Sequence, residues 1–475
     1  MTTPNAVPAP APMSREAIAG VALPKTDVIA AIATASGRAG IGIVRLSGAD
    51  LSPWVGGILG RQAIEPGRAL HSRFMAGDGD TLDEGIALYF AAPHSYTGEN
   101  VLELQGHGGL AVQGAVLRRC LELGARLAEP GEFTRRAFLN DKLDLAQAEA
   151  VADLIDADTS SAARAAMRSL SGEFSNEVHA IVEALTQLRM FTEATLDFPE
   201  EDVEFLEAEQ AGAKLDALGV RLDALLQRAR QGQLLREGLQ VVLIGRPNVG
   251  KSSLLNRLAR DDIAIVTPIA GTTRDAVRQR IEIGGVALHV IDTAGVRDEG
   301  QADEVERIGI ARTWAAARSA DCALVVVDDT RGMTDEDRAI SARLPAAIRR
   351  IVVHNKTDLS GAAARLERDG GEARVYVSAK SGAGIALLET AILDAAGWQP
   401  AAPAQFLARE RHVVALRSAA MHVATSMPHL SLRPAALELF AEELRLAQNV
   451  LASITGEFSA DDLLGEIFSR FCIGK

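Results

Sequence analysis

Cysteine and aromatic residues are scarce in this sequence, and each shortage argues against a class of structure. The 475 residues include only three cysteines, Cys120, Cys322 and Cys472, which lie far apart and form no CxxC pair. Neither a disulfide framework nor a cysteine zinc site fits that spacing, and a reducing cytoplasm is the expected location. Aromatic residues amount to 4%, so the cores must consist mainly of Ala, Leu, Val and Ile.

The sequence also lacks long apolar runs and an excess of positive charge. No apolar stretch approaches the length of a membrane span, so no membrane association is expected. Residues 1–24 are rich in Ala and Pro without a cationic start, which favours a disordered tail over a signal peptide. The net charge is −14, and so acidic a chain does not coat nucleic acid, because counterion release requires a basic face. RNA must meet a local basic patch or come with a partner.

Hydrophobic patterning divides the chain into segments. A chain of 475 residues is too long for one core and suggests about three domains. Short β-rich runs, Gly-rich turns and one helical stretch at 110–123 occupy residues 27–140. Helical spacing follows to about residue 236, strands alternate with helices from Leu239, and helical spacing returns after Pro403.

We therefore predict a multidomain protein, in which an α+β domain precedes an all-α domain that is interrupted by an inserted α/β domain. Two separate helical bundles are the alternative. The predicted segments are the tail (1–24), the α+β domain (25–142), the first helical part (143–236), the α/β domain (237–398) and the second helical part (399–475).

A phosphate-binding loop follows the apolar strand at 241–244. The residues Gly245-Arg-Pro-Asn-Val-Gly-Lys-Ser252 satisfy the pattern GxxxxGK[ST]. Glycines let backbone N–H groups converge on phosphates at a helix N-terminus, Lys251 supplies a charge for the β and γ phosphates, and Ser252 ligates Mg²⁺. An accidental Gly-rich turn is the alternative, and the strand–loop–helix context argues against it.

Further motifs in the expected order identify the base as guanine. Asp292-Thr-Ala-Gly295 ends a strand, which places a carboxylate near Mg²⁺ and a flexible backbone near the γ-phosphate. Asn355-Lys-Thr-Asp358 also follows a strand, and its Asp accepts from guanine N1–H and the 2-amino group, which adenine cannot satisfy. Ser378-Ala-Lys380 fits a loop whose backbone contacts guanine O6.

The first switch is predicted at Gly271-Thr-Thr-Arg-Asp275, where Thr273 closes on Mg²⁺ when a γ-phosphate is present. The residues predicted to contact GTP are Asn248, Val249, Gly250, Lys251, Ser252, Ser253, Thr267, Thr272, Thr273, Asp292, Thr293, Ala294, Gly295, Asn355, Lys356, Asp358, Ser378, Ala379 and Lys380.

The residue that positions the attacking water is not fixed by a motif. Signalling GTPases carry a Gln after Asp-Thr-Ala-Gly, whereas this chain has Val296, which cannot hydrogen-bond water. Glu304, Arg274 and Arg297 are the candidates, and for each the alternative is a solvated surface charge.

With these residues in view, the chain resembles the MnmE (TrmE) family of tRNA-modifying GTPases over nearly everything after the tail. The most specific stretches lie outside the GTPase motifs and are absent from generic Ras-like or Era-like GTPases. They are Gly131-Glu-Phe, residues 136–150, Ala441-Glu-Glu-Leu-Arg-Leu-Ala-Gln448, and residues 467–475, which end in Cys-Ile-Gly-Lys. The resemblance implies a Ras-like fold for the inserted domain.

The resemblance also implies that the N-terminal domain forms a constitutive homodimer and binds a tetrahydrofolate one-carbon donor. The matching residues are Arg45, Glu103, Lys142 and the C-terminal Lys475. Glu103 suits a pterin, which needs a carboxylate-type acceptor, and the cations suit the glutamate tail of the folate. Taken alone, Arg45 or Lys142 reads more simply as a surface charge.

For hydrolysis, the resemblance implies activation by K⁺ when two GTPase domains dimerise. Asn248, Thr267, Ile269 and Thr272 would hold K⁺ roughly where other GTPases place an arginine finger. Glu304 matches the residue that orients the water, and Lys251 and Arg274 complete the predicted catalytic set. Pro268 stands where the family often has an acidic residue, but it leaves neighbouring carbonyls free, so the K⁺ cage is expected to survive.

The resulting prediction is a GTPase that acts with an FAD/NADH-dependent partner of the MnmG (GidA) family in a heterotetramer. Together they would install an aminomethyl or carboxymethylaminomethyl group at C5 of the wobble uridine of certain tRNAs, while GTP turnover opens and closes the dimer. Cys472 is either a buried apolar residue or a nucleophile toward the base. The rival functions are a ribosome-assembly switch, which predicts an RNA-binding module, and a motor whose flanks only dimerise.

Overall fold

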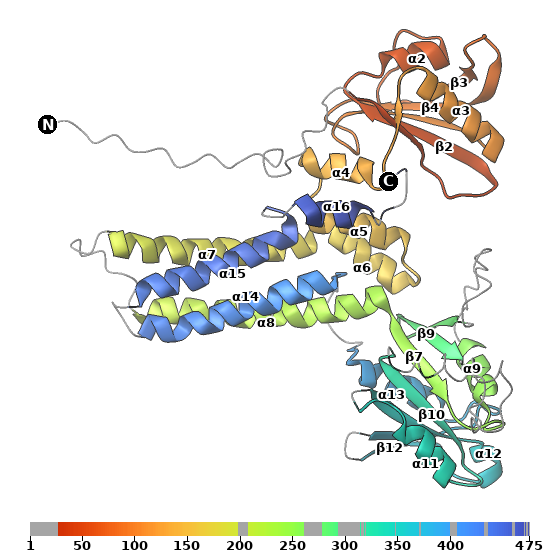
Figure 1. Ribbon diagram of the computed structural model, residues 1–475, viewed down its shortest axis with the longest axis vertical. Coiled ribbons are helices and arrows are strands. Elements are labelled where there is room, and N and C mark those ends of the chain that lie inside the picture. Colours follow the sequence, from red (N-terminus) through yellow and green to blue (C-terminus); the bar gives the residue numbers. More distant parts are fainter. Residues whose placement is uncertain are drawn as a thin grey trace. The chain divides into compact units, whose positions relative to one another are not determined.

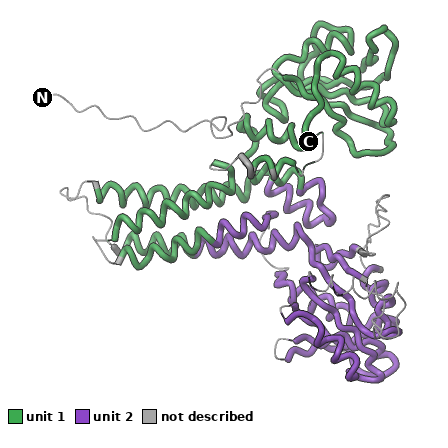
Figure 2. The backbone as a smooth tube through the Cα atoms, in the orientation of Figure 1, with its two compact units in different colours: residues 1–152, 170–219, 418–475 green, residues 153–169, 220–417 purple. Residues whose placement is uncertain are grey.

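The computed structural model divides into two compact units, shown in Figure 2. It describes residues 27–197, 208–260, 278–292, 314, 318, 320–346, 348–369, 372–399, 406–431, 436–457, 461–469, 471 and 474. The first unit comprises residues 1–152, 170–219 and 418–475, and the second comprises 153–169 and 220–417. The division passes through helices α5 (Leu145–Ile155), α8 (Ala208–Glu237) and α14 (Glu410–Ser431). The five segments predicted from the sequence therefore stay predictions.

The first unit contains a six-stranded sheet near the start of the chain (Figure 1). Its order is β3-β4-β5-β2-β1-β6, and only the β1–β6 pairing is parallel. The strands are β1 (Ile29–Ile32), β2 (Ala39–Gly48), β3 (Leu70–Met75), β4 (Thr81–Phe90), β5 (Asn100–Gly108) and β6 (Arg126–Leu127). This confirms the predicted α+β class.

The helix content of this segment is larger than the sequence predicts. The expected helix is α3 (Leu110–Glu122), but α2 (Ser52–Leu59) and α4 (Glu132–Leu139) are also present. Two adjacent glycines hide the helical pattern of α2, which burial of Trp54 and Ile58 stabilises. Charged residues hide the helical pattern of α4, because the charged Arg136 occupies a buried position where an apolar residue would be expected. The prediction of one helix in this segment was therefore wrong. Tertiary packing stabilises two further helices whose sequence patterns are weak.

Side-chain alternation along the strands gives the sheet two different faces. Alternate residues such as Val44, Leu46 and Leu104 pack with α2 and α3 in one apolar core. On the opposite face, Phe133 of α4 packs with Ile29 and Ala31 of β1, the strand next to the β6 edge. The rest of that second face is not covered in this way, since Ile41 of β2 is 64% exposed and Ile86 of β4 is 39% exposed.

A buried ion network fixes α4 to the sheet. The Glu132 side chain is fully buried, and its Oε1 accepts from Arg126 Nη2 at 2.7 Å and from Arg136 Nη2 at 3.0 Å. Arg136 also pairs with Asp27 beside β1 and with Glu99 beside β5. Burial alone would raise the pKa of the Glu132 carboxyl, but hydrogen bonds from Arg126, the Glu129 N–H and Arg136 lower it to about 2.

The remaining helices of this unit include α7 (Glu173–Asp197) and α15 (Leu437–Thr455), which pack against each other and are joined by an Arg189–Gln448 hydrogen bond of 2.8 Å. Near the end of the chain, α16 (Asp461–Ser469) contacts α4. Phe468 and Phe471 pack with Phe138 in one cluster. These contacts bring the C-terminal residues back to the N-terminal part of the chain.

The second unit contains a seven-stranded sheet of order β12-β13-β11-β10-β7-β9-β8, in which the five central strands are parallel. Its strands are β7 (Leu239–Ile244), β8 (Arg278–Ile283), β9 (Val286–Asp292), β10 (Cys322–Asp328), β11 (Arg349–Asn355), β12 (Arg365–Asp369) and β13 (Glu372–Tyr376). Its described helices include α6 (Ser160–Leu170), α9 (Lys251–Arg260), α11 (Asp335–Ala342), α12 (Thr357–Ser360) and α13 (Ile385–Ala396). The predicted parallel, doubly wound sheet is confirmed.

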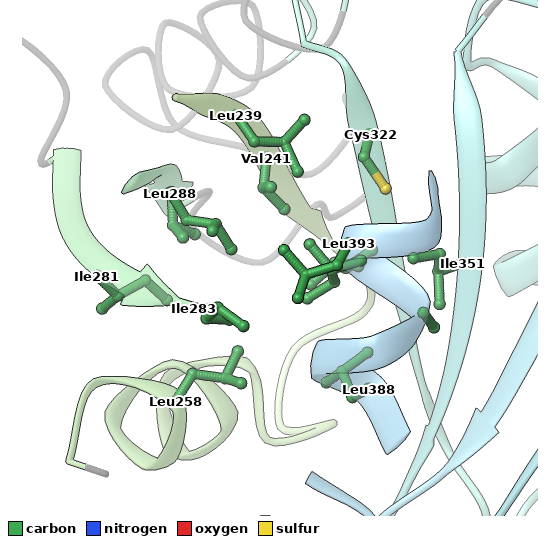
Figure 3. Close-up of a cluster of buried hydrophobic side chains, with 14 of the residues drawn as sticks. Leu239, Val241, Leu258, Ile281, Ile283, Leu288, Cys322, Ile351, Leu388 and Leu393 are labelled. Carbon is green, nitrogen blue, oxygen red and sulfur yellow. The ribbon is translucent and has the colours of Figure 1, made fainter. Parts of the chain in front are cut away.

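Both faces of this sheet are buried, which explains the continuous apolar strands of the sequence. On one face, Val241 and Leu288 pack with Leu258 of α9 and Leu388 of α13 (Figure 3). Alternate residues of the same strands form a second cluster on the other face with Trp314, Ile340 and Leu344. The carboxyl ends of the central strands are thereby held at one edge, where α/β proteins bind ligands.

The Glu132 network gives a prediction about stability and pH. Glu132→Gln should destabilise the first unit by about 3 kcal/mol at neutral pH, because the folded pKa of about 2 lies well below the unfolded value. A depressed carboxyl pKa stabilises the fold above the unfolded pKa of about 4.3, and that contribution is lost as the pH falls toward 2. Denaturant unfolding between pH 7 and pH 3 should therefore show the gap between wild type and variant closing.

Glu129→Gln is the matched control, since Glu129 is 60% exposed and pairs only at the surface with Arg135. A Glu132→Gln variant as stable as this control at pH 7 would contradict the stabilising role of the network.

Candidate functional site

The phosphate-binding loop lies between β7 and α9, as the sequence predicts. Gly245 and Gly250 have φ angles of 153° and 95°, and a Cβ would overlap the Val326 carbonyl oxygen in the first case and the Asn355 amide in the second. Asn248 also has a positive φ, 63°, which asparagine tolerates better than most residues. The glycines of the motif are therefore required by backbone geometry and by close approach of neighbouring strands.

Lys251 begins α9 and turns its side chain back over the loop. Its ammonium donates to the carbonyl oxygens of Gly245 at 2.9 Å and Arg246 at 3.0 Å, and the residue is buried. A positive charge is thus held inside the ring of loop peptides, at the N-terminus of a helix whose free N–H groups favour anions. Ser252 and Ser253 follow it on α9 and are exposed.

Asn355, at the end of β11, connects two loops that are far apart in the sequence. Its Nδ2 donates to the Val249 carbonyl at 2.9 Å, and its Oδ1 accepts from the Ala379 N–H at 3.0 Å. The side chain is buried, so both amide groups are satisfied within the protein. The phosphate loop and the loop predicted to contact guanine O6 therefore form one structure.

Asp358 and Lys356 follow Asn355 on the same strand end. Asp358 Oδ1 accepts from Ser378 Oγ at 2.7 Å, and the Ser381 N–H donates to the same hydroxyl at 3.1 Å. Lys356, with a φ of 71°, donates from Nζ to Asp328 Oδ2 at 2.6 Å. Burial would raise the pKa of Asp328, but the hydrogen bonds from Lys356 and Thr330 outweigh it and lower that pKa.

Asp292 is placed by strand register. It is the last residue of β9 and pairs with Leu243 of β7, two residues before Gly245. The Asp-Thr-Ala-Gly motif therefore begins on the strand next to β7, and its role at Mg²⁺ and the γ-phosphate stays a prediction. The other switch and K⁺ residues lie outside the described residues, namely Thr267, Ile269, Thr272, Thr273, Arg274, Thr293, Ala294, Gly295 and Glu304, together with Pro268, Val296 and Arg297.

Two arginines of this site are missed by motif reading. Arg246 ties the phosphate loop to α11 by pairing with Asp337 at 3.1 Å and Glu336 at 3.0 Å. Arg257 of α9 donates from Nε to the Ala379 carbonyl at 3.1 Å and from Nη2 to the Lys380 carbonyl at 2.7 Å. Their only sequence signal is position, since Arg246 lies inside the phosphate-loop motif and Arg257 lies on the helix that follows it.

The candidate folate residues lie in the first unit, and the structure pairs two of them. Arg45 of β2 donates to Glu103 Oε1 on β5 from Nε at 2.9 Å and from Nη2 at 2.8 Å, while Gln105 donates to Oε2 at 3.2 Å. The guanidinium also lies 5.7 Å from the ring centre of Tyr96 and 5.8 Å from that of Phe133. Glu103 is therefore a partly buried ion-pair partner, which the sequence did not indicate.

The two remaining folate candidates are positioned less completely. Lys142 is exposed and donates to the Pro93 carbonyl at 3.0 Å, in the same connection that carries Tyr96. Lys475 lies outside the described residues, but its neighbour Gly474 is buried so closely against β1 that a Cβ would overlap the Ile32 carbonyl oxygen. In β1, Ala31 is the register partner of Arg45.

The described cysteines are unsuited to redox or metal chemistry. Burial raises the pKa of both the Cys120 and the Cys322 thiol to about 12, so neither forms a thiolate at neutral pH. Cys472 lies outside the described residues. Within the described ranges, no group of three or more His, Cys, Asp or Glu residues is arranged to hold a metal, and no helix has the length and apolarity needed to cross a bilayer.

The fold and this site define a class of protein. A phosphate loop, an Asn-Lys-x-Asp loop and a Ser-Ala-Lys loop meet at the carboxyl edge of a doubly wound sheet, which is the arrangement of a P-loop GTPase.

Comparison with known proteins then identifies the family. Residues 28–142 match the family model described as "GTP-binding protein TrmE N-terminus", and residues 145–472 match "MnmE helical domain". Several relatives carry the name "tRNA modification GTPase MnmE". Those from Paraburkholderia xenovorans and Thiobacillus denitrificans are each 59% identical over 95% of this chain and 99% of their own. The relative from Azoarcus sp. is 61% identical over 94% of this chain and 98% of its own. This chain belongs to the MnmE family.

Proposed function

We propose that this chain hydrolyses GTP and, with a flavin-dependent partner of the MnmG (GidA) type, modifies C5 of the wobble uridine of certain tRNAs. The added group is an aminomethyl or carboxymethylaminomethyl group, whose one-carbon unit comes from a tetrahydrofolate. Family membership supports the coarser statement, a GTPase of tRNA modification. The observation that carries the proposal is that Asn355 joins the phosphate loop to the Ser-Ala-Lys loop. The chain that contains this site also matches these relatives along nearly its whole length.

The phosphate loop fits GTP with Mg²⁺. Gly245 and Gly250 allow the tight turn of the loop, because a Cβ on either would overlap Val326 or Asn355, and Lys251 already holds its charge inside the loop. Ser252, exposed at the start of α9, would ligate Mg²⁺ together with Thr273, and the ion would neutralise charge on the β and γ phosphates. We assign Glu304 the orientation of the attacking water, because Val296 cannot do so.

The homodimer is supported by the half-covered face of the N-terminal sheet. Ile41 and Ile86 on β2 and β4 are exposed there, on the face opposite α2 and α3. Exposed apolar residues on the two strands that flank β5 suit a second copy of the same surface, because a two-fold interface buries one patch against itself. Dimers in the cytoplasm would bring two GTPase domains together around K⁺.

Loss of the gene should remove the modification. In a strain lacking this protein, nucleoside analysis of bulk tRNA should lose the 5-substituted wobble uridine, and the wild-type chain should restore it. Asp358→Asn should fail to restore it, because the guanine amino group loses its acceptor, whereas the exposed α9 variant Asn256→Ala should succeed. Unchanged nucleosides in the deletion strain would favour a ribosome-assembly switch.

Hydrolysis should be at least about tenfold faster in KCl than in NaCl, because K⁺ would stabilise charge on the leaving phosphates as an arginine finger does. Asn248 is exposed in the phosphate loop in a left-handed conformation, where its side-chain oxygen suits an ion on the outer side of the loop. Asn248→Ala should erase the difference between the salts, and Asn256→Ala should keep it. Equal turnover in the two salts would exclude K⁺ activation, with Pro268 as the first residue to replace.

Glu103→Ala should weaken binding of 5-formyltetrahydrofolate by about 5- to 150-fold, equivalent to roughly 1–3 kcal/mol for an unsatisfied polar partner. The structure adds a second reason for weaker binding. The substitution also removes the carboxylate partner of Arg45, whose guanidinium lies near the Tyr96 and Phe133 rings. Calorimetric titration of the full-length chain, without nucleotide and with its dimeric state checked by sedimentation, measures the effect.

The matched control is Glu84→Ala, an exposed carboxylate on the neighbouring strand β4. Equal affinity in wild type and Glu103→Ala would show that Glu103 is not the pterin acceptor. No folate binding in wild type would remove the one-carbon step from the proposal and leave the GTPase.

A further inference from the structure

We infer that Arg257 is a positioning residue for guanine specificity, acting through the Ser378–Gly382 loop on the recognition of position 6 of the base. The inference rests on the proposed assignment of that loop to guanine O6. Arg257 lies on α9, the helix that begins with the phosphate-binding Lys251, so one rigid element would serve both ends of the nucleotide.

The contacts of the guanidinium are to backbone carbonyls of two consecutive residues. Its Nε donates to Ala379 O at 3.1 Å and its Nη2 to Lys380 O at 2.7 Å. A hypothetical Cβ on Gly382 would lie only 3.7 Å from Arg257 Cζ, so the guanidinium lies against the loop beyond those two contacts as well. The planar fork of arginine matches two carbonyls held side by side, which a lysine ammonium cannot reproduce.

Because peptide groups are planar, the two contacts also fix the directions of the Lys380 and Ser381 N–H groups. The Ala379 carbonyl shares its peptide plane with the Lys380 N–H, and the Lys380 carbonyl shares its plane with the Ser381 N–H. Because C=O and N–H point in opposite directions across a trans peptide, holding both carbonyls toward α9 turns both N–H groups away from it. The Ser381 N–H accordingly reaches the Ser378 hydroxyl at 3.1 Å.

The same loop is held at its other contacts by residues already placed in the site. The Ala379 N–H donates to Asn355 Oδ1, and the Ser378 hydroxyl donates to Asp358. The carboxylate proposed to read the 2-amino group is therefore held by the Ser378 side chain, whereas the peptide planes that follow Ser378 are held by Arg257. Losing Arg257 should affect discrimination at position 6 of the purine and spare discrimination at position 2.

Two altered nucleotides separate these positions. Inosine diphosphate lacks the 2-amino group and keeps O6, while 6-thioguanosine diphosphate keeps the 2-amino group and N1–H but carries sulfur, a weaker acceptor, at position 6. Diphosphates avoid hydrolysis during calorimetric titration of the full-length chain. Wild type should prefer GDP over both analogues.

Arg257→Ala should bind GDP about tenfold more weakly, as expected when a charged hydrogen-bonding group is removed. Its preference for GDP over the thio analogue should fall toward one, and its preference for GDP over IDP should stay at the wild-type value. Arg257→Lys, which keeps the charge but not the fork, should fall between. Asp358→Asn should show the reverse pattern, and Asn256→Ala, exposed on the same helix, should match wild type in both ratios.

Equal weakening for all three nucleotides in both Arg257 variants, with both ratios unchanged, would overturn the inference and leave Arg257 a stabiliser of α9. A wild type that does not distinguish GDP from the thio analogue would instead overturn the assignment of the loop to O6. Thermal melting of each variant identifies unfolding, and Arg257→Lys keeps the test decisive should the alanine variant fail to fold.

Discussion

The two hydrogen bonds of the Asn355 side chain are the constraint on which the nucleotide site depends. Val249 belongs to the phosphate loop and Ala379 to the Ser-Ala-Lys loop, and no stretch of sequence joins them directly. A buried amide that gave up either partner would leave an unsatisfied polar group, at a cost of about 1–3 kcal/mol. Because the amide has one donor side and one acceptor side, it fixes both the distance between the loops and their orientation.

The sheet makes this connection achievable. Parallel pairing of β7, β10 and β11 brings the ends of the three strands to one edge, and apolar packing on both faces prevents them from shifting in register. Arg246 and Arg257 then attach the loops at this edge to α11 and to α9. Side chains from different elements thus hold the loops of the site, which is the arrangement that preorganised recognition requires.

In the first unit, a buried ion network connects distant segments, as the Asn355 amide does in the second. Glu132 is tolerated in the interior because Arg126 and Arg136 satisfy both its charge and its hydrogen-bonding capacity. The network places Phe133 under Arg45, and the C-terminal residues pack against the same helix through Phe468. The end of the chain thus contributes to the region in which the folate candidates lie.

The sequence by itself determined the local features of this protein. The glycines of the phosphate loop, the apolar runs of the parallel sheet and the order of the nucleotide motifs are readable because each depends on backbone geometry within a few residues. The family resemblance likewise rests on contiguous stretches. Helices α2 and α4 could not be predicted, because glycines and buried charges obscure their hydrophobic periodicity and tertiary packing stabilises them.

What only the tertiary structure decided are the pairings between distant residues. Arg257 meets Ala379 and Lys380, Arg45 meets Glu103, and Gly474 meets Ile32, and in each case strand register or helix packing sets the partner. A motif specifies which side chain is present, but hydrogen bonds need partners within about 3 Å, and those distances arise only when the chain folds.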